Sequence, residues 1–128
     1  MTTITRESFS EAIEAAVAER GPDFIYPLEW KEEFPGNDDP TALRCVYFKE
    51  GVGPACIIGV ALDKLGVDVE KIVNSDASTI LSALGATDLG LLRAADLAQN
   101  QQDLGRPWVD ALADYQETLE RYPRADAD

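Results

Sequence analysis

The cysteines Cys45 and Cys56 are the side chains of this sequence whose type and position best suit nucleophilic or redox chemistry. Cys56 stands two residues after Pro54 at the start of an apolar run, and the sequence therefore predicts it in the first turn of a helix. The positive end of a helix dipole stabilises a thiolate, which makes Cys56 the candidate reactive thiol. The alternative is that both cysteines are small core residues, as free cysteines usually are.

The sequence gives little support for any other catalytic or metal-binding site. The sequence contains no His, and two cysteines eleven residues apart are half of a zinc tetrad. A disulfide between them is feasible if a strand packs on the helix, although a reducing compartment disfavours it. The sequence has no phosphate-binding glycine loop, no Ser/His/Asp set and no Walker motif. We therefore expect a protein that is not an enzyme, with no cofactor and no metal.

A segment rich in aromatic and acidic side chains is the candidate partner-binding surface. It comprises Trp30, Glu32, Glu33 and Phe34. An apolar anchor surrounded by charge is the arrangement in which protein interfaces concentrate binding energy. The alternative is that these aromatic side chains fix a loop to the core. The acids nearby offer a carboxylate pair, but Asn37-Asp38-Asp39 lacks the alternating pattern of a calcium loop.

The chain of 128 residues has a net charge of −13. Residues 1–40 carry 3 basic and 10 acidic groups, residues 41–85 carry 4 and 5, and residues 86–128 carry 4 and 9. This charge disfavours direct binding to nucleic acid and to anionic membranes, because both need clustered Lys and Arg. It fits a basic protein partner, or a surface that only keeps the protein in solution. A further interpretation is a DNA mimic that inhibits a DNA-binding protein.

The location and the domain organisation follow from length and from apolar runs. The longest uncharged apolar run, residues 52–62, has 11 residues, whereas about 20 are needed to span a bilayer. No basic segment followed by an apolar one opens the chain, so we expect no signal peptide and a cytoplasmic protein with reduced thiols. The length fits one globular domain over residues 1–128, with frayed tails at 1–4 and 123–128.

The elements that must position these side chains are mainly helical. Apolar spacing predicts a helix over 6–20 with Thr5 as its N-cap, and a core helix over 54–65. Further helices are expected over about 67–73, 76–84 and 88–104, with a last helix from Pro107. Residues 42–48 form the best strand candidate, with 24–26 as its antiparallel partner. We expect a compact single-domain bundle of five or six helices with a short two-stranded β element.

Two packing predictions follow from the same spacing. Ala55 and Gly59 share a face of the predicted core helix, and a glycine there lets another backbone approach closely. The helix over 88–104 is expected to bury an apolar face made of Leu89, Leu92, Ala95, Leu97 and Ala98.

The order and spacing of several motifs resemble a family of small proteins from actinobacteria and their phages. The matching residues are Cys45-Val46-Tyr47, then the run from Gly53 to Gly59, then Leu65-Gly66-Val67, and a stretch from Ala94 to Leu112. Members of the family show Cys-x-Tyr, then Gly-x-Pro-x-Cys-Ile/Leu-Val-Gly, then Leu-Gly-Val. They often carry a His where this chain has Ala61. The resemblance covers about half of the chain and implies a fold and an origin, with no activity attached.

The leading hypothesis is therefore a small, acidic, non-enzymatic protein-interaction module of phage or actinobacterial type, with a host regulatory protein as a partner. The alternatives are the DNA mimic, which requires the carboxylates of the first and last helices to line up, and a thiol-based enzyme or sensor that uses Cys56.

Overall fold

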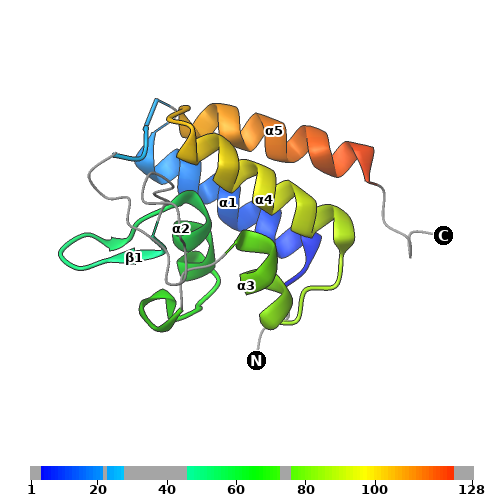
Figure 1. The fold of residues 1–128 in the computed structure, drawn as a ribbon, viewed down its shortest axis with the longest axis horizontal. Helices are drawn as coiled ribbons and strands as arrows, with labels where there is room; N and C mark the ends of the chain where they lie inside the picture. Colours follow the sequence, from blue (N-terminus) through cyan, green and yellow to red (C-terminus); the bar gives the residue numbers. More distant parts are fainter. Residues whose placement is uncertain (1–3, 22, 28–45, 73–75, 123–128) are drawn as a thin grey trace, which may run out of the picture.

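The computed structural model describes residues 4–21, 23–27, 46–72 and 76–122. Over these residues it has five α-helices and one two-stranded antiparallel sheet, so the predicted mainly helical class is confirmed (Figure 1). In chain order the elements are α1 (Arg6–Arg20), β1 (Phe48–Lys49), β2 (Gly53–Pro54), α2 (Ile57–Lys64), the 3-10 helix η2 (Val69–Lys71), α3 (Ala77–Ala83), α4 (Leu89–Asp103) and α5 (Trp108–Arg121).

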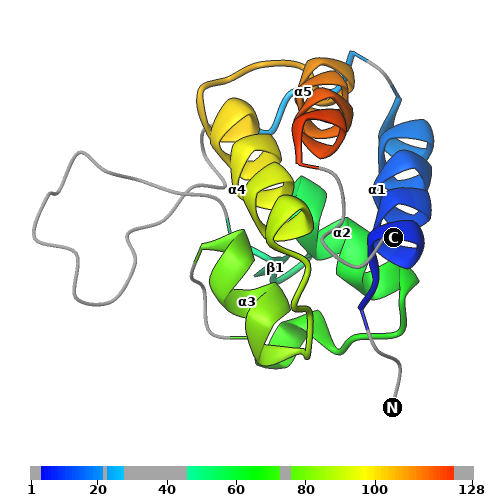
Figure 2. The same cartoon turned by 90° about the vertical axis from the view of Figure 1, so that its right-hand side faces the viewer.

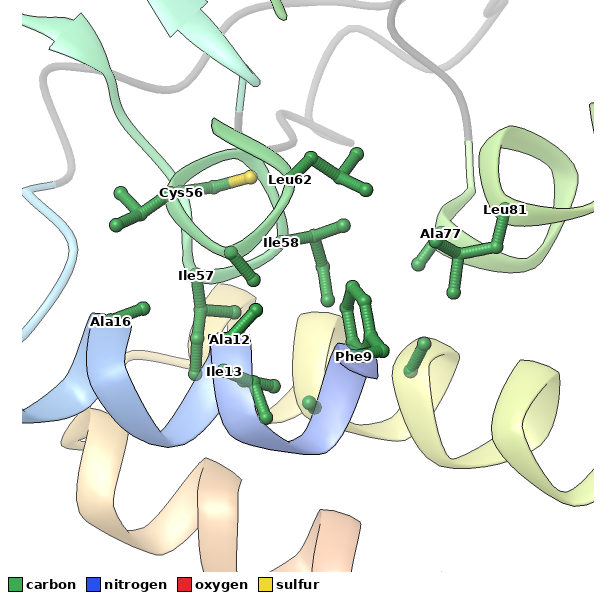
Figure 3. Close-up of a cluster of buried hydrophobic side chains, with 14 of the residues drawn as sticks. Phe9, Ala12, Ile13, Ala16, Cys56, Ile57, Ile58, Leu62, Ala77 and Leu81 are labelled. Atoms are coloured by element: carbon green, nitrogen blue, oxygen red, sulfur yellow. The ribbon is translucent and has the colours of Figure 1, made fainter. Parts of the chain in front are cut away.

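The short helix α2 is the centre of the packing. Every residue from Ile57 to Leu62 is buried, and α2 lies between α1 and α4, with α5 above it (Figure 2). In Figure 3, Ile57 and Ile58 point toward the apolar side chains of α1, and Ala77 and Leu81 of α3 lie to the right of Ile58 and Phe9. Because the apolar residues of α2 leave no polar face over this stretch, the helix is stable only when its neighbours cover it.

Several helix boundaries follow the sequence closely. The first helix begins after Thr5, whose hydroxyl accepts from the Ser8 N–H while the Ser8 hydroxyl accepts from the Thr5 N–H, which is a capping box. Asp76 and Asp88 precede α3 and α4 as expected, and Pro107 precedes α5. Thr5 and Asp88 cap their helices through local side-chain bonds, so these two starts are readable from the sequence, whereas Asp76 and Pro107 make no such cap bond.

The start of the core helix and the strand pairing were predicted wrongly. The helix begins at Ile57 with Cys56 as its N-cap, because Gly53-Pro54 belongs to strand β2. The partner of β2 is β1, in the register Phe48 to Pro54 and Lys49 to Gly53, whereas residues 24–26 form no strand. Tyr26 instead contacts this region through its side chain, whose hydroxyl accepts from the Val46 N–H at 3.0 Å.

Two smaller expectations also need correction. Ile4 is not frayed but buried in the core. The short helix expected over about 67–73 is present as the 3-10 helix η2, and residue 73 lies outside the described residues. In α4, Leu89 is 58% exposed, and the buried face comprises Gly90, Leu91, Ala94, Ala95, Ala98, Gln99 and Gln102. The predicted face is correct at Ala95 and Ala98 and wrong at Leu89, because small residues, Leu91 and two glutamines occupy the buried side.

The prediction for Gly59 is confirmed. A Cβ atom at this position would lie 3.0 Å from the Cα atom and 3.1 Å from the carbonyl carbon of Tyr47, and closer still to the carbonyl oxygen. The same carbonyl oxygen accepts from the Ala55 N–H at 3.0 Å. The glycine therefore lets the backbone before β1 rest directly on α2.

Within the described part of the chain, no helix is both long enough and apolar enough to cross a membrane.

Candidate functional site

The candidate thiol Cys56 is enclosed by the core. Its side chain is 0% exposed, and its Sγ atom accepts from the Gly59 N–H at 3.3 Å, which caps the first turn of α2. A reagent can reach this sulfur only after local opening of the structure. The sulfur thus has a structural role in the fold, and its reactivity stays a prediction.

The remaining candidate residues cannot be placed. Trp30, Glu32, Glu33, Phe34 and Cys45 lie outside the described residues. Among the residues that are described, no group of three or more Cys, Asp or Glu side chains is arranged to hold a metal ion.

A ladder of polar side chains on α4 holds the starts of two other helices. Gln102 Oε1 accepts from the Ile57 N–H at 2.7 Å, and Gln99 Oε1 accepts from the Ala77 N–H at 2.8 Å. Asp96 Oδ1 accepts from the Ser78 N–H at 2.7 Å. Each bond satisfies a backbone donor that the first turn of α2 or α3 cannot pair within its own helix. This ladder therefore fixes α2 and α3 on α4 and offers no reacting group to a substrate.

The ladder was missed from the sequence, although a signal exists. Its three members follow one another at spacings of three residues, which places them along one side of a helix. Gln99 also donates from Nε2 to the Tyr47 hydroxyl at 2.9 Å, so one buried amide joins α3, α4 and the segment before β1. A buried glutamine needs such partners, because an unpaired amide in the core costs free energy.

The guanidinium of Arg6 joins three helix ends. It donates to both carboxylate oxygens of Asp88, at 2.7 Å from Nε and 2.6 Å from Nη2, and to the Tyr122 carbonyl oxygen at 2.8 Å. Asp88 in turn accepts from the Leu91 N–H at the start of α4. The hydrogen bonds from Arg6 hold the pKa of Asp88 below its ordinary value. This ion pair connects the start of α1 with the start of α4 and the end of α5.

A cluster of aromatic side chains closes the opposite end of the molecule. The Phe24 ring meets the Trp108 ring edge-on at 4.7 Å between centroids. The Arg20 guanidinium lies 5.2 Å from the Phe24 centroid and 5.5 Å from the Trp108 centroid, and donates to the Pro54 carbonyl oxygen at 2.6 Å. The backbone N–H of Trp108 donates to the Phe24 carbonyl oxygen at 2.8 Å. The segment after α1, the start of α5 and the sheet are therefore held together here.

Three large apolar side chains are exposed around this cluster. Leu104 is 74% exposed, Ile25 48% and Val109 40%. They belong to the α4–α5 turn, the segment after α1 and the first turn of α5, which meet at one end of the bundle (Figure 1). We call Ile25, Leu104 and Val109 the apolar end. Sequence reasoning missed it, since the turn formed by Gly105-Arg106-Pro107 predicted a loop and gave no reason for the leucine before it.

The acidic side chains of α1 and α5 are interrupted by basic ones. On α5, Glu117 pairs with Arg121, and Asp110 lies 3.9 Å from Arg106. On α1, Glu19 pairs with Lys64 at 3.1 Å. A DNA mimic needs rows of carboxylates that stay unneutralised. Exposed pairs of this kind neutralise a carboxylate only weakly, so the DNA mimic stays a prediction beside the protein-interaction module.

Comparison of the chain with protein-family models, with curated proteins and with solved structures gave no match. The proposals below therefore rest on the residues and the geometry described above.

Proposed function

We propose that this chain is a small, acidic, non-enzymatic protein-interaction module. The observation that carries the proposal is the apolar end, where three large apolar side chains stand exposed on a protein with a net charge of −13. Single exposed apolar side chains are common on protein surfaces, whereas a group of them ringed by polar residues is typical of interaction sites.

The interior supports the same proposal. The buried polar side chains Gln99 and Gln102 bond to backbone groups of neighbouring elements, and the sulfur of Cys56 caps α2. These groups serve the fold and stay away from the surface. The resulting scaffold presents its exposed side chains rigidly, which lowers the entropy lost when a partner binds.

We propose a host regulatory protein as the class of partner, whereas the resemblance to actinobacterial and phage proteins implies only a fold and an origin. The experiment is affinity purification of the tagged full chain from an actinobacterial lysate at low and at high salt, with mass spectrometry of the retained proteins. Retention of one protein at both salt concentrations is the expected result, because apolar contacts survive screening of the charges. If no protein is specifically retained at either concentration, the proposal is wrong.

Trp30→Ala and Leu104→Ser distinguish the two candidate surfaces in this experiment. Loss of the partner with Leu104→Ser assigns binding to the apolar end, and loss with Trp30→Ala alone assigns it to the aromatic and acidic segment. Leu89→Ser is the matched control, because Leu89 is an exposed leucine at the other end of the same helix.

A further inference from the structure

We infer that the apolar end binds a positively charged segment of a partner protein that carries apolar side chains of its own. This inference rests on the proposed function and specifies its surface and the chemistry of the partner.

Two side chains of the apolar end, Ile25 and Val109, adjoin the partly buried Phe24 and the buried Trp108. Ile25 directly follows Phe24, and Val109 directly follows Trp108, and these two neighbours are joined by the backbone hydrogen bond of 2.8 Å and by their edge-on rings. Trp108 is 0% exposed, so the start of α5 is anchored in the core. The anchoring at Phe24 and Trp108 restricts the backbone beside Ile25 and Val109, and this reduces the cost of binding.

Carboxylates flank each apolar side chain. Asp23 stands two residues before Ile25, Asp103 directly precedes Leu104, and Asp110 directly follows Val109. The side chain of Asp23 is exposed, and that of Asp110 is about half exposed. Arg106 in the same turn lies 3.9 Å from the Asp110 carboxylate and is itself half exposed, so solvent weakens this pair. An apolar centre with acids at its rim matches a partner that has the opposite charge at its own rim.

The net charge selects the occupant. Two copies of this chain would each bring a charge of −13 to the contact, and the repulsion opposes self-association. The same charge attracts a basic segment over a distance and raises its association rate. The contact itself then gains its free energy from burial of Leu104 and its two apolar neighbours.

The test uses a synthetic amphipathic peptide of Leu and Lys as the probe, added to the isotope-labelled full chain and followed by NMR. Two further peptides serve as references, one with the Lys residues replaced by Glu and one with the Leu residues replaced by Ser. We expect the Leu/Lys peptide to shift the amide signals of Ile25, Leu104 and Val109, and both references to bind more weakly by about tenfold or more.

Variants of the chain identify the surface. Leu104→Ser and Val109→Ser are expected to weaken binding of the Leu/Lys peptide by about tenfold, and Leu89→Ser to leave it unchanged. Because all three side chains are exposed, the variants should keep the fold, which circular dichroism verifies. If the shifts map to the carboxylates of α1, or if Leu104→Ser binds as tightly as the wild type, the apolar end is not the site.

The outcomes separate this inference from the proposed function. A lysate protein that is retained equally by the wild type and by Leu104→Ser overturns the inference and leaves the interaction module intact. Equal binding of the Leu/Lys and the Leu/Glu peptides overturns the choice of a basic partner. Failure to retain any lysate protein contradicts the proposed function itself.

Discussion

Replacement of Gly59 by alanine tests the central packing contact of this protein. Glycine in the middle of a helix is normally unfavourable, and Gly→Ala then stabilises a protein by about 1 kcal/mol. Here the new Cβ atom would stand 3.0 Å from the Tyr47 Cα atom and nearer still to its carbonyl oxygen. Because these are backbone atoms rather than the end of a flexible side chain, α2 or the segment before β1 must move.

The magnitude follows from three contributions. Overpacking of a tight core costs about 1–3 kcal/mol. The displaced Tyr47 carbonyl oxygen also accepts from the Ala55 N–H at 3.0 Å, and loss of this bond costs about 1 kcal/mol. The gain in helix propensity offsets about 1 kcal/mol. We therefore expect Gly59→Ala to lower the free energy of unfolding by about 1–3 kcal/mol, the opposite sign to an ordinary helix glycine.

Urea unfolding followed by circular dichroism measures this difference in free energy, and thermal unfolding followed by the same signal measures the midpoint temperature. At about 4 °C per kcal/mol for a domain of this size, the thermal midpoint should fall by about 4–12 °C. Ala15→Gly is the matched control, because Ala15 is exposed near the middle of α1 and reports helix propensity alone, with an expected loss of about 1 kcal/mol. A Gly59→Ala variant as stable as the wild type, or more stable, would refute the close approach of the two backbones.

Three other measurements follow from the described contacts. Gln102→Leu removes a buried acceptor from the start of α2 and should cost about 1–3 kcal/mol in urea unfolding, whereas the partly exposed Gln101→Leu should change stability by less than about 0.5 kcal/mol. The folded pKa of Asp88 is lowered, so its ion pair stabilises the protein above about pH 4, and this stabilisation is lost as the pH falls through the lowered pKa. The difference in unfolding free energy between wild type and Asp88→Asn should therefore shrink below about pH 4. A difference that stays constant with pH would contradict this. In a Cys45→Ser background, Cys56 should react with a maleimide far more slowly in native buffer than in urea, and equal rates would show an accessible sulfur.

The sequence by itself determined the helical class and most helix boundaries. Thr5 and Asp88 cap α1 and α4 through bonds to residues three positions further on, and Pro107 directly precedes α5, so a reader of the sequence finds these starts. The start of α3 after Asp76 has no such local bond, because side chains of α4 accept from its first donors. Gly59 was also readable, because a glycine at the centre of an apolar helix indicates close packing. These features depend on local spacing, which the sequence displays directly.

The candidate site was less readable. The sequence predicted Cys56 in the first turn of a helix, whereas Cys56 is the N-cap residue directly before α2. Its complete burial depends on which elements pack around it, and the sequence does not show this. Leu89 and Leu104 look alike in the sequence, since each stands at an end of α4. Leu104 belongs to the turn that meets two other segments at one end of the bundle, and Leu89 starts α4 at the opposite end (Figure 1). Position relative to distant segments made the difference.

Only the tertiary structure decided how the elements are joined. The register of β1 with β2, the partners of Gln99 and Gln102 at helix starts, and the ion pair of Arg6 with Asp88 are contacts that residue spacing alone does not specify. A backbone donor at a helix start can be satisfied by many side chains, and the sequence does not say which one arrives. That choice follows from the packing of α2 against α1 and α4, because a polar group becomes a partner only where the apolar faces bring it into reach.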